Sequence, residues 1–321
     1  MFRRLVLALA VLMFSRTPAL AQPAYSGVFF FGTSELDTGN WLENPALAGN
    51  PFAPTPERGF YKGRWQSGPA WSDYFAEALG YNALASLLGG NNYAYGLGWL
   101  GPLAGETPAP GSLSAQSALY FGSQIDAALA AHPFGLASDA LYVVTIGSND
   151  PSFYGRTVVD APAVAALAVA QIQRLANAGA RSLLVQTVGG TDAYTVTYNQ
   201  HLLNGLAAIS GITVSVLDTR TFNQTVALAP GFLTGLGITD FGSCLADAAC
   251  AAAAIAKTTK GEAYFGNTHF LFDNIHRDTK VAEALANYAL TRLPYTVPEP
   301  GTVALLTFGL LGTGLLRMRR R

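Results

Sequence analysis

The chain has 321 residues, of which half are hydrophobic and only 12% are charged, and this length suits one large domain. Seven of the 19 lysines and arginines and one of the 20 acidic residues lie in the end segments 1–21 and 297–321, which leaves 12 basic and 19 acidic residues between them. Because this acidic middle contains no basic cluster, we expect it to bind neither nucleic acid nor an anionic membrane surface.

The first 21 residues have the pattern of a signal peptide. Arg3 and Arg4 form a short basic region, residues 5–14 are apolar, and Ala19-Leu20-Ala21 is a small-x-small cleavage site. A membrane-spanning anchor is the alternative, but it needs about 20 apolar residues and this run is shorter. We therefore expect export with cleavage after residue 21.

The segment between the ends alternates strand-like and helix-like stretches. The continuous apolar runs at 28–31 and 140–146 are typical of buried parallel strands. In chain order, the predicted elements are a strand at 28–31, a long loop at 41–69, a helix at 71–79, a short strand at 91–96, a helix at 114–131, a strand at 140–146, a helix at 161–178, a strand at 182–188, a helix at 198–210, a strand at 212–217 and a helix at 278–290. This alternation predicts a single α/β domain over residues 22–296, with a central parallel sheet covered by helices on both faces.

The C-terminal segment 297–321 has three parts. Val-Pro-Glu-Pro at 297–300 leads into an apolar run at 301–316, and a cluster of arginines follows. The run is at the short end for a spanning helix, and the arginines should stay on the cytoplasmic side. This order resembles the PEP-CTERM sorting signal of Gram-negative bacteria. The resemblance implies transient anchoring in the inner membrane, recognition by an exosortase, and release to the cell surface or extracellular matrix. A plain membrane anchor is the alternative.

The two cysteines, Cys244 and Cys250, lie close together in a chain predicted to reach an oxidising compartment. We expect them to form a local disulfide. Two cysteines without neighbouring histidines make a poor metal site. The bridge fails if residues 244–250 form one regular helix, because positions six apart then do not face each other.

Ser34 directly follows the first predicted strand, at the sheet edge where open α/β sheets bind their ligands. It is a candidate nucleophile, although the same position suits a helix cap or a turn. An activated serine needs a histidine base and a carboxylate that orients the histidine. Of the four histidines, His276 alone stands in an Asp-x-x-His turn, three residues after Asp273 and just before the last predicted helix. This pattern predicts Asp273 and His276 as the partners of Ser34.

Hydrolysis through a serine also needs hydrogen-bond donors for the oxyanion of the tetrahedral intermediate. Two predicted strand ends offer them, the backbone N–H of Gly96 and the side-chain amide of Asn149. Glycine permits close approach of the backbone to a ligand. An ordinary turn role is the alternative for each residue.

Five segments are distributed over nearly the whole predicted domain: Phe31–Asn40, Gly63–Trp71, Asn92–Gly96, Ile146–Asp150 and Asp273–His276. In this order they resemble the sequence blocks of the GDSL, or SGNH, hydrolase family. The resemblance implies a three-layer α/β/α sandwich, flavodoxin-like in order, with no metal and no organic cofactor. It implies that Ser34 is the nucleophile, His276 the general base and acid, and Asp273 its orienter. It also implies an oxyanion hole formed by the N–H groups of Ser34 and Gly96 and the side chain of Asn149.

Three positions depart from the family pattern. The aspartate before the serine is Thr33 here, the leucine after it is replaced by Glu35, and the proline after the histidine is Arg277. None of these changes removes a catalytic group. Glu35, however, places a carboxylate beside the nucleophile, where it would oppose the developing oxyanion or repel acidic substrates.

These features predict a secreted serine esterase or lipase that hydrolyses carboxylic esters through an acyl-enzyme. The first alternative is an acyltransferase or deacetylase that acts on a surface polysaccharide or lipid, and the second is an extracellular matrix protein of the same fold without turnover. An aspartic protease is excluded because Asp-Thr-Gly occurs only once, at 37–39. The Gly-x-Ser-x-Gly elbow of α/β-hydrolases is absent.

Overall fold

The computed structural model describes residues 25–294 with the exception of 227 and 230. The predicted signal peptide and the predicted sorting segment, including its apolar run at 301–316, lie outside the described residues. Residues 25–293 cluster as one unit. Within this described part, no helix is both long and apolar enough to cross a membrane.

The central sheet consists of parallel strands in the order β1-β2-β3-β4. Their bounds are Val28–Gly32, Leu141–Thr145, Ser182–Gln186 and Thr213–Leu217. The first two strands are buried along their whole length, as expected for apolar strands covered on both faces. The last residues of the four strands are register partners, so their carboxyl ends form one straight edge: Gly32, Thr145, Gln186 and Leu217.

A further segment lies along the free side of β1. Asn92 forms a parallel bridge with Phe30, supported by hydrogen bonds from Phe30 N to Asn91 O and from Tyr93 N to Phe30 O, at 3.0 and 2.8 Å. The predicted strand at 91–96 is therefore reduced to a bridge. When this segment is counted second in chain order, the sheet order is 2-1-3-4-5, as in flavodoxin.

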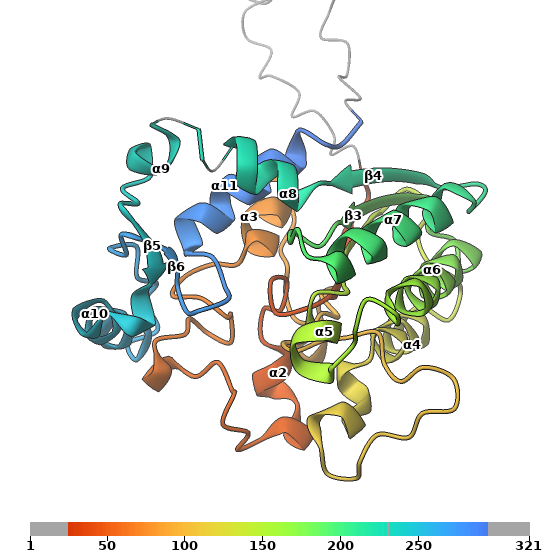
Figure 1. The fold of residues 1–321 in the computed structure, drawn as a ribbon, viewed down its shortest axis with the longest axis horizontal. Coiled ribbons are helices and arrows are strands. Elements are labelled where there is room, and N and C mark those ends of the chain that lie inside the picture. Colours follow the sequence, from red (N-terminus) through yellow and green to blue (C-terminus); the bar gives the residue numbers. More distant parts are fainter. Residues whose placement is uncertain (1–24, 227, 230, 295–321) are drawn as a thin grey trace, which may run out of the picture. The chain divides into compact units, whose positions relative to one another are not determined.

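Helices cover both faces of the sheet (Figure 1). On one face, α4 (Phe121–Ala131), α6 (Ala161–Asn177) and α7 (Ala193–Ala207) pack over a core that includes Phe31 and Val144. On the other face, α3 (Trp71–Ala78) and α11 (Thr279–Leu290) pack against each other and over a second core, which includes Phe30 and Val143. Successive strand residues point to opposite faces, which explains why neighbours belong to different cores. The three-layer α/β/α sandwich is confirmed.

The remaining elements lie in the connections. A small parallel sheet of β5 (Asp240–Ser243) and β6 (His269–Leu271) was not predicted. The remaining described α-helices are α2 (Asn40–Glu43), α5 (Asn149–Tyr154), α8 (Thr219–Thr221), α9 (Phe232–Gly235) and α10 (Ala248–Thr258).

Two helices begin several residues away from the predicted positions. Helix α4 begins at Phe121 rather than at residue 114, because Trp99 pairs with the chain on both sides of Tyr120 and holds it extended. Trp99 N donates to Leu119 O, and Phe121 N donates to Trp99 O. Helix α7 begins at residue 193 rather than 198, because the carboxylate of Asp192 accepts a hydrogen bond from the N–H of Thr195 and caps the helix.

Candidate active site

The turn after β1 brings Ser34 to the carboxyl edge of the sheet. The N–H groups of Leu36 and Asp37 both donate to Thr33 O, at 3.0 and 3.2 Å, which closes the turn. Gly32 begins it with a φ of +137°, and a Cβ there would lie 1.8 Å from Thr145 O. Only glycine can end the strand in this way, so the local sequence Gly-Thr-Ser fixes where the hydroxyl of Ser34 is presented.

Ser34, His276 and Asp273 form a continuous chain of hydrogen bonds. Ser34 Oγ lies 2.7 Å from His276 Nε2, although 242 positions separate the two residues in the sequence. His276 Nδ1 lies 2.8 Å from Asp273 Oδ2. Both Ser34 and His276 are buried. The structure therefore brings together the three residues that the sequence predicted as partners.

The turn at 273–276 holds the carboxylate in place. Asp273 Oδ1 accepts hydrogen bonds from the N–H groups of Ile275 and His276, at 2.8 and 2.6 Å. Burial alone raises the pKa of Asp273, but His276 and these hydrogen bonds outweigh it, and the pKa lies below its ordinary value. An ionised Asp273 can only accept, so it selects the histidine tautomer with a proton on Nδ1 and a free lone pair on Nε2.

The N–H of Gly96 is not a free donor, which differs from the expectation. It donates to Asp37 Oδ2 at 2.8 Å. Asp37 is completely buried and also accepts from Trp65 Nε1 at 3.4 Å; its burial raises its pKa. The indole ring of Trp65 lies 5.4 Å from the ring of His276, and a Cβ at Gly96 would lie 1.9 Å from that indole. Gly96 thus makes room for the aromatic wall beside the histidine.

Asn149 occupies the predicted position at the end of the β2 connection, as the first residue of α5. Its Nδ2 donates to Gly98 O at 2.8 Å, and its side chain is buried. An amide nitrogen carries two hydrogens, so this bond leaves a second N–H. Because Asn149 lines the same cavity as Ser34, that N–H is a candidate donor to a bound ligand.

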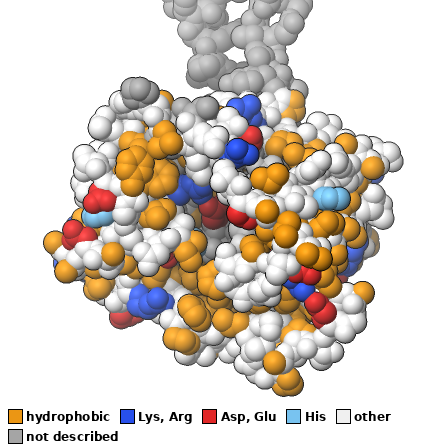
Figure 2. Space-filling view, viewed as in Figure 1, with side chains coloured by type: hydrophobic (Ala, Val, Ile, Leu, Met, Phe, Trp, Pro, Cys, Tyr) orange, Lys and Arg blue, Asp and Glu red, His pale blue; other side chains and the backbone are white. Residues whose placement is uncertain are grey.

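A cavity of about 720 Å³ opens beside Ser34 and His276. Figure 2 shows the molecule hollowed near the centre of this face, with acidic and basic side chains beside the hollow. The volume is typical of a small-molecule site. Side chains with hydroxyl or amide groups form one part of the wall: Thr33, Ser148, Gln186, Thr187 and Thr195. Apolar side chains form another part: Ile146, Phe153, Val188 and Ile275.

The residues that flank Ser34 behave differently from each other. Thr33 is buried, and within the described chain its hydroxyl has no hydrogen-bond partner. Glu35 lines the cavity and accepts hydrogen bonds from Arg277 and Gln186. The roles of Asp37 and Gln186 near the site were not predicted from the sequence, and neither was the contact of Trp65 with the histidine. Asp37 and Trp65 lie within two of the five family-like segments, which was the available signal.

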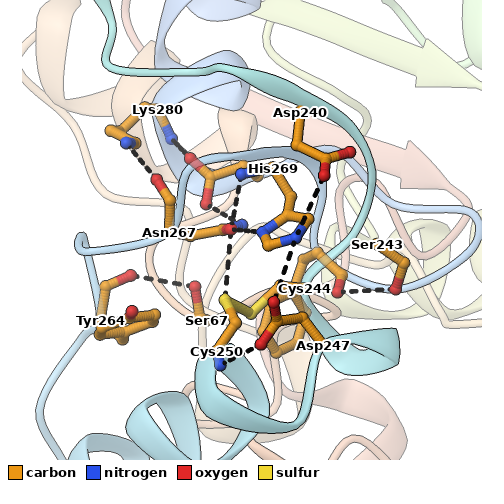
Figure 3. Close-up of a disulfide and its surroundings, with 12 residues drawn as sticks. Ser67, Asp240, Ser243, Cys244, Asp247, Cys250, Tyr264, Asn267, His269 and Lys280 are labelled. Carbon is orange, nitrogen blue, oxygen red and sulfur yellow. Dashed lines mark hydrogen bonds and ion pairs between the residues drawn. A yellow bond between two sulfur atoms is a disulfide. The ribbon is translucent and has the colours of Figure 1, made fainter.

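Cys244 and Cys250 form a disulfide with a Cα–Cα distance of 5.3 Å. Residues 244–246 form a 3-10 turn that ends before α10 begins at Ala248, so the two cysteines do not share one regular helix. Figure 3 shows the bridge beside Asn267 and His269. The disulfide segment also contacts the candidate site, because Leu245 N donates to Phe272 O at 2.9 Å, directly before Asp273.

Metal-ligating side chains do not gather in the described part of the chain. No group of three or more histidine, cysteine, aspartate or glutamate residues there is placed to hold a metal ion.

A parallel sheet with a Ser–His–Asp chain at its carboxyl edge defines the class of α/β proteins with a serine-hydrolase-type site. Residues 28–289 match the GDSL-like Lipase/Acylhydrolase family, and the chain belongs to this family. Residues 296–321 match the PEP-CTERM protein-sorting motif. Both resemblances seen in the sequence are thereby confirmed, and they support a hydrolase of esters that carries an exosortase sorting signal. A search of curated proteins finds no match to the chain.

Proposed function

We propose that the protein is a secreted serine esterase that hydrolyses carboxylic esters through an acyl-enzyme. The observation that carries the proposal is the unbroken hydrogen-bond chain from Ser34 Oγ through His276 to Asp273, at 2.7 and 2.8 Å. This is the arrangement that a nucleophile, its base and the orienting carboxylate require. The adjoining cavity gives an ester room to reach Ser34.

In the proposed reaction, Ser34 Oγ attacks the ester carbonyl carbon while His276 Nε2 takes the hydroxyl proton. The negative charge that develops on the carbonyl oxygen is stabilised by the N–H of Ser34 and the second amide N–H of Asn149. His276 then gives its proton to the leaving alcohol, and the acyl group stays on Ser34. A water molecule, activated by His276, releases the carboxylic acid.

Gly96 has no place in this oxyanion site. Its N–H donates to the buried carboxylate of Asp37, and breaking that bond would cost this desolvated carboxylate one of its hydrogen bonds. We assign to Gly96 the structural role of admitting Trp65 beside His276.

We further propose that the protein acts at the cell surface or outside the cell. The sorting motif at 296–321 is the basis for this location, and we expect the signal peptide and the apolar run at 301–316 to direct export and transient anchoring before exosortase processing. A disulfide between Cys244 and Cys250 suits an oxidising compartment.

A second candidate is acyl transfer to a hydroxyl of a surface polysaccharide, or deacetylation of an acetylated one. The observation in its favour is the hydroxyl- and amide-rich wall of the cavity, which includes Thr187 and Thr195. Product analysis with p-nitrophenyl acetate and an added sugar distinguishes transfer from hydrolysis, since transfer yields an acetylated sugar and hydrolysis yields acetate. Release of acetate from an acetylated sugar would indicate deacetylation.

Replacing the nucleophile tests the main proposal. We expect Ser34→Ala to lower kcat for p-nitrophenyl acetate and butyrate by about 10⁴-fold or more. Ser152→Ala is the matched control, because Ser152 lines the same cavity and its hydroxyl contacts the backbone oxygen of Ser148. Near-normal turnover by Ser34→Ala, with the fold intact by circular dichroism, would refute the proposal.

A further inference from the structure

The two charged departures from the family pattern meet in the structure. Glu35 follows the candidate nucleophile, and Arg277 follows the candidate base. Arg277 Nη1 donates to Glu35 Oε1, so the two positions form an ion pair across 242 residues of sequence. The side chains of Glu35 and Arg277 are only 24% and 12% exposed, respectively, so water screens the pair much less than it screens an exposed one.

Both members of the pair are held by further hydrogen bonds. Gln186 Nε2 donates to Glu35 Oε2 at 2.6 Å, and Thr145 Oγ1 donates to Gln186 Oε1 at 3.0 Å. On the other side, Arg277 Nη2 donates to Asn223 Oδ1 at 3.2 Å. The network therefore joins the nucleophile turn and the histidine turn to the carboxyl ends of β2 and β3. Side chains anchored in this way have little freedom to separate.

The ion pair changes the balance of charge around His276 and Ser34. Asp273 faces the ring from its own turn, Trp65 covers it with an uncharged indole, and Glu35 and Arg277 share two cavities with it. An unpaired carboxylate at Glu35 would oppose the negative charge that forms on the carbonyl oxygen during attack by Ser34. Arg277 cancels that charge.

We infer that the Glu35–Arg277 ion pair is a positioning element for the hydrolysis proposed above: it ties the turn of Ser34 to the turn of His276 and neutralises the carboxylate beside the nucleophile. The inference rests on the proposed function. It also explains why the two family positions depart together in this chain, since either charge alone would be unfavourable at a partly buried site.

A double-mutant cycle of Glu35→Gln, Arg277→Met and the double variant tests the inference. We expect Arg277→Met to lower kcat/KM by about 10- to 100-fold and Glu35→Gln to lower it less. The double variant should lose less activity than Arg277→Met but stay below wild type, because its charges are balanced while the tie between the two turns is gone. The rising limb of the pH–rate profile should move to higher pH in Arg277→Met and to lower pH in Glu35→Gln, and it should return in the double variant. Arg277→Lys, which keeps the charge, should leave that limb near its wild-type position.

Urea unfolding of the same variants separates this inference from the proposed function. We expect each single variant to lower the unfolding midpoint by more than the double variant does, whether or not the protein turns over an ester. Additive effects on both activity and unfolding, or unchanged pH profiles in the single variants, would overturn the inference. If the effects on unfolding are coupled in the double-mutant cycle but the wild-type protein hydrolyses no ester, the proposed function is refuted. The ion pair then remains a structural tie.

Discussion

Replacing Asp273 by asparagine probes the orientation of His276 with almost no change in size. The carboxylate now accepts three hydrogen bonds, two from backbone N–H groups and one from the imidazole, at 2.6 to 2.8 Å. An asparagine can keep the two backbone bonds through its oxygen, but its NH₂ group then faces Nδ1 of His276. The ring must accept that hydrogen bond, so its proton moves to Nε2 and the lone pair that faced Ser34 is lost.

The expected loss follows from that tautomer change. In the serine-protease template the equivalent substitution lowers kcat by about 10⁴-fold, which corresponds to about 5.5 kcal/mol of transition-state stabilisation. We expect a loss of similar size for Asp273→Asn with p-nitrophenyl butyrate, measured at saturating substrate so that kcat is separated from KM. A loss smaller than about tenfold would show that Asp273 does not orient the base.

The chain offers a matched control for this experiment. Asp240 also lies near a histidine, with Oδ2 at 3.8 Å from His269 Nε2, but its side chain is 58% exposed. Asp240→Asn therefore removes a carboxylate from an Asp–His contact outside the cavity beside Ser34. It should leave kcat within about twofold of wild type, as expected for a surface substitution.

Two further predictions concern stability. Burial raises the pKa of Asp150 from its ordinary 3.8 to about 7, so folding favours the protonated form; this stabilisation is complete at low pH and is lost as pH rises from about 4 through about 7. Asp150→Asn should weaken this dependence, and urea midpoints that fall between pH 5 and 8 as steeply in the variant as in wild type would contradict the assignment. Reducing the Cys244–Cys250 bridge with dithiothreitol should cost about 2 kcal/mol for so short a loop and lower esterase activity, because its segment supports Phe272 beside Asp273. Unchanged activity in the reduced, folded protein would separate the bridge from the site.

The sheet and its helices were largely predictable because their residues carry local signals. Apolar runs such as 140–146 fixed the buried strands to within a residue or two, and glycines such as Gly179 marked where helices stop. The start of α4 was not predictable, since it depends on Trp99 pairing with the chain around Tyr120. No periodicity within the helix itself reports such a tertiary contact.

The candidate site shows the same limit at the level of single atoms. The residue types of Ser34, Asp273 and His276 and their order along the chain pointed to one sheet edge. The sequence could not show which backbone N–H groups are free to bind a ligand there. That depends on the buried carboxylate of Asp37, which accepts a hydrogen bond from the N–H of Gly96. The pairing of Glu35 with Arg277 was hidden as well, since two charges 242 positions apart give no local pattern.

The activation of Ser34 by His276 is tested most directly by labelling with a fluorophosphonate, followed by peptide mass spectrometry. An activated serine attacks the phosphorus and displaces fluoride, which leaves a phosphonyl group on its oxygen. We predict a single adduct on the peptide that contains Ser34 in the wild-type protein, and labelling at least about 100-fold slower in His276→Ala. A folded wild-type protein that stays unlabelled, or that carries the adduct on another residue, would contradict the proposed mechanism.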